Sequence, residues 1–134
     1  MYKVLYKWME GFFLTVTDRI ATLKASGVIS DEVAGVSLKA VDWLKNNHID
    51  IESDNCQMFV THLAMSLERI ISGEPVEGIP QEMMEEVRSS KGYAAAMEFT
   101  HYLEQLVGKQ LPIEERDYIL LHLAVLIEVS GRCD

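Results

Sequence analysis

Apolar residues recur along the chain at intervals of three and four positions, which is the spacing of one face of an amphipathic helix. No segment shows the sustained alternation of a strand, and no Asn-Gly or Asp-Gly hairpin turn occurs. We therefore expect an all-α fold, a bundle of five to six helices. The pattern predicts these helices over residues 3–25, 31–44, 54–72, 81–89, 91–107 and 112–130.

Residues with suitable capping chemistry stand at the ends of these predicted helices. Ser30, before the second helix, and Ser53 or Asp54, before the third, carry side-chain oxygens that can accept a hydrogen bond from a first-turn N–H. Gly73 and Gly108 follow predicted helices and suit the left-handed conformation that often ends a helix. Pro112 suits a first turn, where its missing N–H costs nothing. The boundaries and the periodicity thus support one another.

Length and charge limit the classes of protein to consider. A chain of 134 residues with 49% hydrophobic content can form one domain with its own core. Its 12 basic and 21 acidic side chains give a formal net charge of −9. Such a surface repels nucleic acid phosphates and anionic lipid, so we expect no direct nucleic-acid binding.

Cysteines and apolar stretches indicate the compartment. The two cysteines, Cys56 and Cys133, form neither a disulfide framework nor a CxxC motif. The apolar N-terminal stretch is interrupted by Glu10 and followed by Asp18, without the small-residue cleavage site of a signal peptide. No apolar run approaches the roughly 20 residues of a membrane span. We expect a cytoplasmic protein without membrane insertion.

Two of the four histidines suggest no site of their own. His48 falls in a polar loop after a predicted helix, where a solvated side chain is expected. His101 follows Glu98 at the ExxH spacing, which is half of the motif of a carboxylate-bridged di-metal site. The second ExxH and the additional carboxylates are missing. We therefore expect no metal and no cofactor.

The other two histidines are candidates for a functional site. His62 is followed after seven positions by Arg69, and His122 is preceded by Glu115 at the same interval. Seven residues are about two helical turns, so each pair shares one helix face. Either histidine could be a core residue, a metal ligand, a catalytic base or a phosphoryl acceptor.

The chemistry of the chain narrows these four alternatives. There is no HExxH motif or Cys/His cluster for zinc, and no GxSxG motif for a nucleophilic serine. A phosphoryl acceptor needs a neutral imidazole nitrogen and, nearby, a cation that offsets the incoming charge. His62 with Arg69 on one face offers both groups.

Two segments also resemble a known family. THLAMSLER, residues 61–69, and LPIEERDYILLHL, residues 111–123, closely resemble the two signature segments of the PTS regulation domain. This helical module occurs in antiterminators and activators controlled by the bacterial sugar phosphotransferase system. The matching positions are His62, Arg69, Pro112, Glu115 and His122. The resemblance spans about residues 29–130, with residues 79–106 similar to the intervening helices.

The resemblance implies a regulatory protein and not an enzyme. Domains of this family are helical bundles that form dimers and accept phosphoryl groups on histidine from the phosphocarrier protein or a sugar-specific transport component. It implies His62 and His122 as phosphoacceptors, with Arg69 and Glu115 as supporting groups. Phosphorylation would control transcription or antitermination. We assign residues 29–131 to the domain and residues 1–28 to an N-terminal helical extension of the same unit.

Output and assembly are expected to involve other chains. Residues 1–28 offer room for about one helix and not for an RNA-binding arm, so we expect a separate transcription regulator as partner. Trp8, Phe12 and Phe13 could supply buried surface for a homodimer. Two rival hypotheses are a docking module that keeps the fold without receiving phosphate, and a metal protein or enzyme that uses Glu98 and His101 together with the core histidines.

Overall fold

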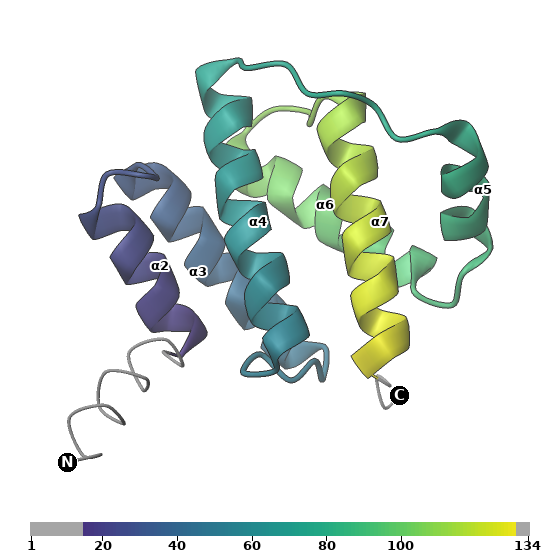
Figure 1. Cartoon of the computed structure of the whole chain (residues 1–134), viewed down its shortest axis with the longest axis horizontal. Coiled ribbons are helices and arrows are strands. Elements are labelled where there is room, and N and C mark those ends of the chain that lie inside the picture. Colours follow the sequence, from purple (N-terminus) through teal and green to yellow (C-terminus); the bar gives the residue numbers. More distant parts are fainter. Residues whose placement is uncertain (1–14, 131–134) are drawn as a thin grey trace, which may run out of the picture.

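The computed structural model describes residues 15–130, and this part of the chain contains helices and no strand (Figure 1). The all-α prediction is thereby confirmed for these residues. The helix predicted over residues 3–25 does not continue through Thr15, which is an extended N-cap, so that α2 begins at Val16. Residues 3–14 of that prediction, with Trp8, Phe12 and Phe13, lie outside the described residues. The described helices are α2 (Val16–Ala25), α3 (Asp31–Asn46), α4 (Asp54–Ser72), α5 (Gln81–Ser89), α6 (Tyr93–Val107) and α7 (Ile113–Ser130).

The predicted caps are present at both kinds of helix end. The Ser30 hydroxyl accepts the N–H of Val33 at the start of α3, and the Ser53 hydroxyl accepts the N–H of Cys56 at the start of α4. Helices α4 and α6 end at Gly73 and Gly108, which adopt φ of 76° and 82°. These left-handed values are strained for residues with a Cβ, which explains glycine at both positions.

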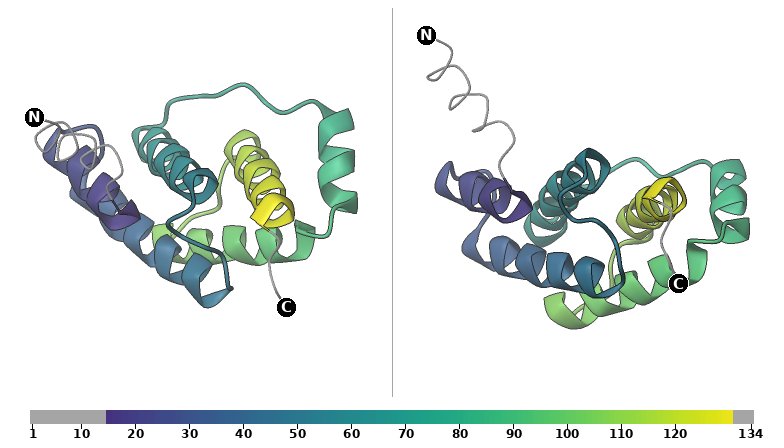
Figure 2. Two further views of the ribbon diagram at one scale, coloured as in Figure 1. Left: turned by 60° about the horizontal axis from the view of Figure 1, so that its bottom comes forward. Right: turned by 90° about the horizontal axis from the view of Figure 1, so that it is seen from below.

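The helices form two layers, which are seen from the edge in the right-hand view of Figure 2. α4 and α7 lie side by side and antiparallel in one layer, with α2 beside α4 and α5 beside α7 (Figures 1 and 2). α3 and α6 form the second layer and pack behind them. Residues 73–80 cross from the end of α4 to α5. The antiparallel arrangement sets early α4 residues opposite late α7 residues.

An aromatic cluster in the core joins the two layers. Phe99 of α6 is fully buried, and its ring centroid lies 5.1 Å from that of Trp43 and 5.9 Å from that of Phe59. These rings connect α3, α4 and α6, and such pairs contribute roughly 0.5–1.5 kcal/mol beyond burial. The cluster packs against the inner face of α4, so the outer face of α4 is available for other contacts.

A close backbone approach holds α7 from behind in the same way. Gly92, at the start of α6, is buried, and a Cβ at this position would lie 3.0 Å from the Ala124 carbonyl oxygen. Because glycine has no Cβ, α6 and α7 can meet this closely. Among the helices of residues 15–130, none is long and apolar enough to cross a membrane.

Candidate functional site

His62 and His122, 60 residues apart in sequence, lie next to each other in the structure. His62 extends from α4 and His122 from α7, with ring centroids 6.3 Å apart and ring planes inclined by 24°. The His62 side chain is exposed, whereas His122 is half-buried. The antiparallel contact of α4 and α7 therefore brings the two predicted site histidines into one pair with unequal access to solvent.

The surroundings of His122 favour its neutral form. Burial lowers the pKa of His122 from its ordinary value near 6.5, and the nearby charge of His62 lowers it further. The Tyr118 ring, one turn earlier on α7, lies 4.3 Å from the His122 ring between centroids. At neutral pH the His122 ring thus carries one N–H and one nitrogen with a free lone pair.

The two histidines lie in a shallow groove of about 220 Å³ between α4 and α7, here called the histidine groove. Several apolar side chains of the groove remain in contact with solvent, including Met58 at 60%, Val125 at 53% and Val129 at 63% exposed. The groove is lined by Asn55, Met58, Phe59, His62, His122, Val125, Leu126 and Val129. Exposed apolar surface around polar groups is common at binding sites.

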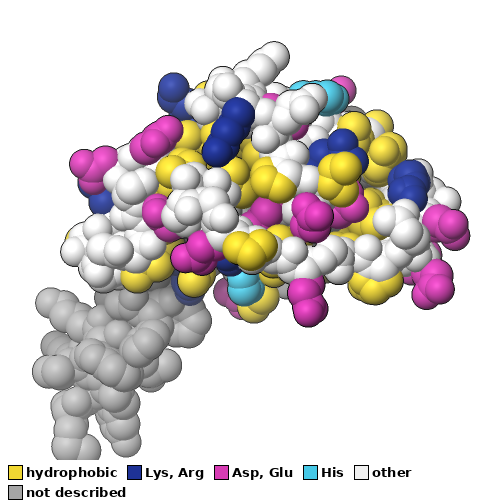
Figure 3. Space-filling model, turned by 90° about the horizontal axis from the view of Figure 1, so that it is seen from above, with side chains coloured by type: hydrophobic (Ala, Val, Ile, Leu, Met, Phe, Trp, Pro, Cys, Tyr) yellow, Lys and Arg dark blue, Asp and Glu magenta, His cyan; other side chains and the backbone are white. Residues whose placement is uncertain are grey.

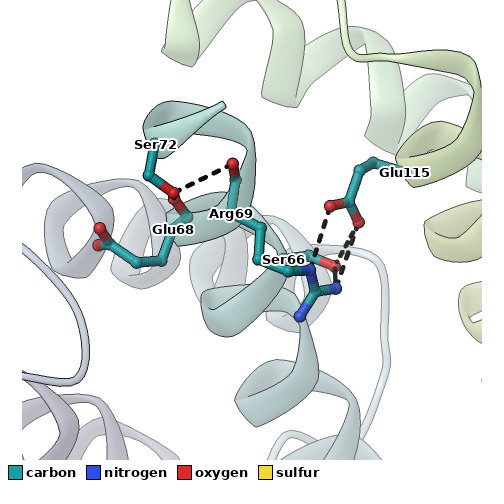
Figure 4. A network of polar contacts seen from close by, with 5 residues as sticks. All are labelled: Ser66, Glu68, Arg69, Ser72 and Glu115. Atoms are coloured by element: carbon teal, nitrogen blue, oxygen red, sulfur yellow. Dashed lines mark hydrogen bonds and ion pairs between the residues drawn. The ribbon is translucent and has the colours of Figure 1, made fainter. Parts of the chain in front are cut away.

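Arg69 and Glu115 contact each other and not the histidines. Arg69 Nε donates to Glu115 Oε2 at 3.2 Å, and its terminal nitrogen lies 3.3 Å from Glu115 Oε1 (Figure 4). The Ser66 hydroxyl donates to Glu115 Oε1 at 3.0 Å and accepts from Arg69 at 2.9 Å. The Glu115 side chain is only 2% exposed. Ser66, Arg69 and Glu115 form one ion-pair network that links α4 to α7.

This ion-pair network lies away from the histidine pair along the helices. Seven residues separate Arg69 from His62 and Glu115 from His122, which is an axial rise of about 10 Å. The network is at the end where residues 73–80 cross. The face at that end, seen from above in Figure 3, mixes hydrophobic side chains with acidic and basic ones. The predicted supporting groups therefore support the contact between two helices.

Ser66 was not among the sequence candidates, although its position carries a signal. It falls four residues after His62 and three before Arg69, on the same face of α4. A small polar residue at a buried position between two functional candidates suggests a hydrogen-bond partner across the helix contact. Sequence spacing alone could not show that this partner is Glu115.

The remaining histidines lie elsewhere. His48 is exposed and adopts φ of 64°, in the turn after α3. His101 is 67% exposed, and its Nδ1 lies 3.5 Å from Glu104 Oε1, while Glu98 is also exposed. Within the described part of the chain, no three His, Cys, Asp or Glu side chains are grouped as metal ligands would be. The Glu98 and His101 pair thus has no additional ligand among these residues.

The geometry of the histidine groove suits a reaction at imidazole nitrogen. A nucleophilic imidazole must be accessible, and its second nitrogen must be able to keep a proton. His62 meets the first condition because it is exposed, and the half-buried His122 lies beside it as a second donor or acceptor. Such a pair can accept a group from a macromolecule that docks over the groove.

Comparisons with known proteins agree with the sequence signatures. The chain is 27% identical over 110 residues to the uncharacterized protein YhfY of Escherichia coli (strain K12), covering 78% of this chain and 88% of the relative. No solved structure matches the chain. The sequence profile of the PRD domain matches residues 41–126, a range that contains both histidines, the ion-pair network and most of the bundle. The chain therefore belongs to the PRD domain family, the family of PTS regulation domains.

Proposed function

We propose that this protein is a phosphorylation-responsive regulator of the bacterial sugar phosphotransferase system that acts through histidine phosphorylation and dimerisation. PRD domains are regulatory and not catalytic modules, which supports a role without enzymatic turnover. The phosphoryl donor would be the phosphocarrier protein or a sugar-specific transport component. The output would be the control of transcription or antitermination through a separate regulator.

One observation carries this proposal: His62 and His122 form a surface pair, with ring centroids 6.3 Å apart, although they come from distant segments. A purely structural histidine is usually enclosed and hydrogen-bonded. His62 instead stays exposed within an apolar groove, where a donor protein can reach its nitrogen atoms. An added phosphoryl group would bring about 1.5 to 2 negative charges to this position.

The apolar rim of the histidine groove supports a coupling between dimerisation and phosphorylation. Met58, Val125 and Val129 are each more than half exposed, and they border both histidines. Burying these side chains against a second copy would be favourable, at roughly 25 cal/mol for each Å² of apolar surface. A charged phosphoryl group in the same groove would change that contact, so phosphorylation and assembly would be coupled.

Phosphotransfer followed by intact-mass measurement tests the proposed function. The protein is incubated with phosphoenolpyruvate, enzyme I and the phosphocarrier protein, with and without a sugar-specific transport component. A mass gain of one phosphoryl group is expected for the wild type and for the control H48Q, which changes an exposed histidine outside the groove. The doubly substituted chain H62Q/H122Q is expected to show no gain.

The same samples report on assembly. Sedimentation of the phosphorylated and unphosphorylated protein is expected to give different proportions of monomer and dimer. Absence of any mass gain with every donor would favour a docking module that keeps the PRD fold without receiving phosphate.

A further inference from the structure

The two histidines differ in accessibility, which assigns them different roles. Phosphoryl transfer between proteins needs the donor phosphorus to approach the acceptor nitrogen along the line of the breaking bond. His62 is exposed and open to such an approach. His122 is half-buried, with the Tyr118 ring 4.3 Å away between centroids. Access alone therefore favours His62 as the acceptor.

Among residues 15–130, the side chains that line the histidine groove include no permanent cation for the incoming charge, because none of them is Lys or Arg. Arg69, which the sequence places on the same face as His62, is bound to Glu115 and Ser66 about two turns away. Moving Arg69 to the groove would leave Glu115 buried without its ion-pair partner, which is unfavourable. Besides the acceptor His62 itself, His122 is the described lining residue that can become positively charged.

We propose that His62 accepts the phosphoryl group and that His122 binds it as a protonated imidazolium, so that each chain carries one phosphoryl group and not two. This inference rests on the proposed function, because it concerns the same phosphorylation. It goes further by giving the two histidines unequal roles and by replacing Arg69 with His122 as the cation of the phosphosite.

The separation of the rings suits this arrangement. The near-parallel rings have centroids 6.3 Å apart, so a turn about the side-chain bonds would bring a phosphoryl oxygen on His62 to the roughly 2.7–2.9 Å of a charge-assisted hydrogen bond with the His122 N–H. A second phosphoryl group on His122 would instead place two multiply charged groups at the same short separation. Like charges so close oppose each other strongly, so double phosphorylation is disfavoured.

Atoms and charges balance in this reaction. The lone pair of one His62 ring nitrogen attacks the phosphorus of a phosphohistidine donor, forming a new N–P bond while the donor's N–P bond breaks. The electron pair of the broken bond returns to the donor ring, and each ring keeps the proton on its other nitrogen. His122 then takes one proton from solvent, so the phosphorylated chain binds one proton more.

The groups around His122 explain why its protonation depends on the phosphoryl group. In the unphosphorylated chain, burial and the charge of His62 lower the pKa of His122. From α5, Glu86 borders a neighbouring cavity together with Glu128 of α7, on the other side of Val125. The buried residues of α6 include no charged side chain. A phosphoryl group on His62 supplies the close negative charge that the groove lacks, and it raises the pKa of His122.

Three variants at the two histidines test the assignment in the full-length protein. H62Q is expected to abolish the mass gain, whereas H122Q keeps a gain of one phosphoryl group but lowers the transfer equilibrium constant roughly tenfold, the loss of a hydrogen bond to a charged group. H122K restores a cation and is expected to recover most of that loss. Thermal melting of each variant establishes that it is folded under the assay conditions.

The pH dependence distinguishes a protonated partner from a structural residue. As pH rises from near neutral to alkaline, the phosphorylated fraction of the wild type is expected to fall as His122 loses its proton. H122K should lose this dependence because lysine stays charged, and H122Q should be low throughout. A structural His122 would give parallel profiles for the wild type and both variants, and this result would overturn the proposal.

A titration of the wild type alone gives an independent answer. The ring-proton resonances of His122, followed by NMR, should titrate at higher pH in the phosphorylated protein than in the unphosphorylated protein. An unchanged midpoint, a gain retained in H62Q but lost in H122Q, or a gain of two phosphoryl groups would each overturn the proposal. No gain in the wild type with any donor would instead remove the proposed function itself.

Discussion

Polar side chains have different surroundings at the two ends of the contact between α4 and α7. At one end Ser66, Arg69 and Glu115 satisfy each other, with Glu115 2% exposed. At the other end His62 and His122 face each other across a groove bordered by exposed apolar side chains. The two ends belong to the same pair of helices and are about 10 Å apart.

The difference shows which polar groups are available for chemistry. The charges of the ion-pair network already have partners, and buried charges that lose their partners are costly. Within the described chain, no hydrogen bond from a ring nitrogen of His62 or His122 holds the two helices together. Residues that share one helix face can thus have different roles. Arg69 is held in a structural ion pair, whereas His62, two turns away on the same helix, is available for a reaction.

The largest expected effect comes from breaking the ion-pair network. Glu115→Ala leaves Arg69 and Ser66 without their acceptor in a contact where Glu115 is buried. We expect the free energy of unfolding to fall by about 3 kcal/mol, near the low end for a broken buried pair because Arg69 is 29% exposed. Urea denaturation followed by circular dichroism measures the change.

A double substitution separates the structural role from a role in phosphorylation. Arg69→Met combined with Glu115→Leu removes both charges and keeps apolar volume, so it should recover much of the lost stability. The recovered protein should also accept phosphate. Recovered stability without phosphorylation would mean that the network serves the phosphosite directly.

The next effect is expected at Ser66, which has a matched control in Ser37. Both serines are fully buried, but the Ser66 hydroxyl bonds to Glu115 and Arg69, whereas Ser37 Oγ has no partner within residues 15–130. Ser66→Ala should lower the free energy of unfolding by about 2 kcal/mol, because its bonds involve charged groups. Ser37→Ala should leave it unchanged or raise it. Equal effects in denaturation would contradict the contrast.

The fold was largely predictable because its signals are local. The three-to-four spacing of apolar residues defined the helices over residues 31–130, and Ser30, Ser53, Gly73 and Gly108 marked their ends as the structure has them. A cap depends on one side chain and the nearest backbone N–H, so sequence contains it in full. The pairing of helices depends on distant residues, and periodicity alone did not provide it.

The candidate site was predictable in its members but not in its contacts. His62, Arg69, Glu115 and His122, which the two signature segments named, all lie along the contact of α4 and α7. Sequence spacing joined each histidine to the charged residue on its own helix. The structure pairs equivalent residues across the helices instead, because antiparallel packing sets Arg69 opposite Glu115 and His62 opposite His122.

A smaller effect is expected from a substitution at the start of α6 that crowds the backbone of α7. Gly92→Ala would place a methyl group 3.0 Å from the Ala124 carbonyl oxygen and 3.2 Å from Ile127 Cβ. We expect the free energy of unfolding to fall by about 1 kcal/mol, since backbone must shift to accept the added group. Gly35→Ala is the matched control, because its Cβ would meet nothing within 4 Å and alanine favours a helix.

This pair of glycine variants also tests how firmly the two ends of the α4–α7 contact are connected. Gly92 approaches Ala124, two residues after His122, so a shift of α7 there should alter the histidine groove first. Chemical-shift changes in an NMR spectrum of G92A should therefore be larger around His122 than around Glu115. Equal changes at both ends would mean that α7 moves as a rigid body.

The smallest expected effect is the pH dependence of stability at the histidine groove. Burial, and secondarily the charge of His62, lower the pKa of His122 in the folded chain, so the unfolded chain binds the proton first as pH falls below about 6.5. The free energy of unfolding should thus decline with falling pH until folded His122 also titrates. Denaturation of H122Q should lack this decline. The variant H62Q should show a smaller dependence of the free energy of unfolding on pH, but should keep some of it, because burial is the larger cause of the lowered pKa. If the dependence vanished in H62Q, the charge of His62 and not burial would be the main cause.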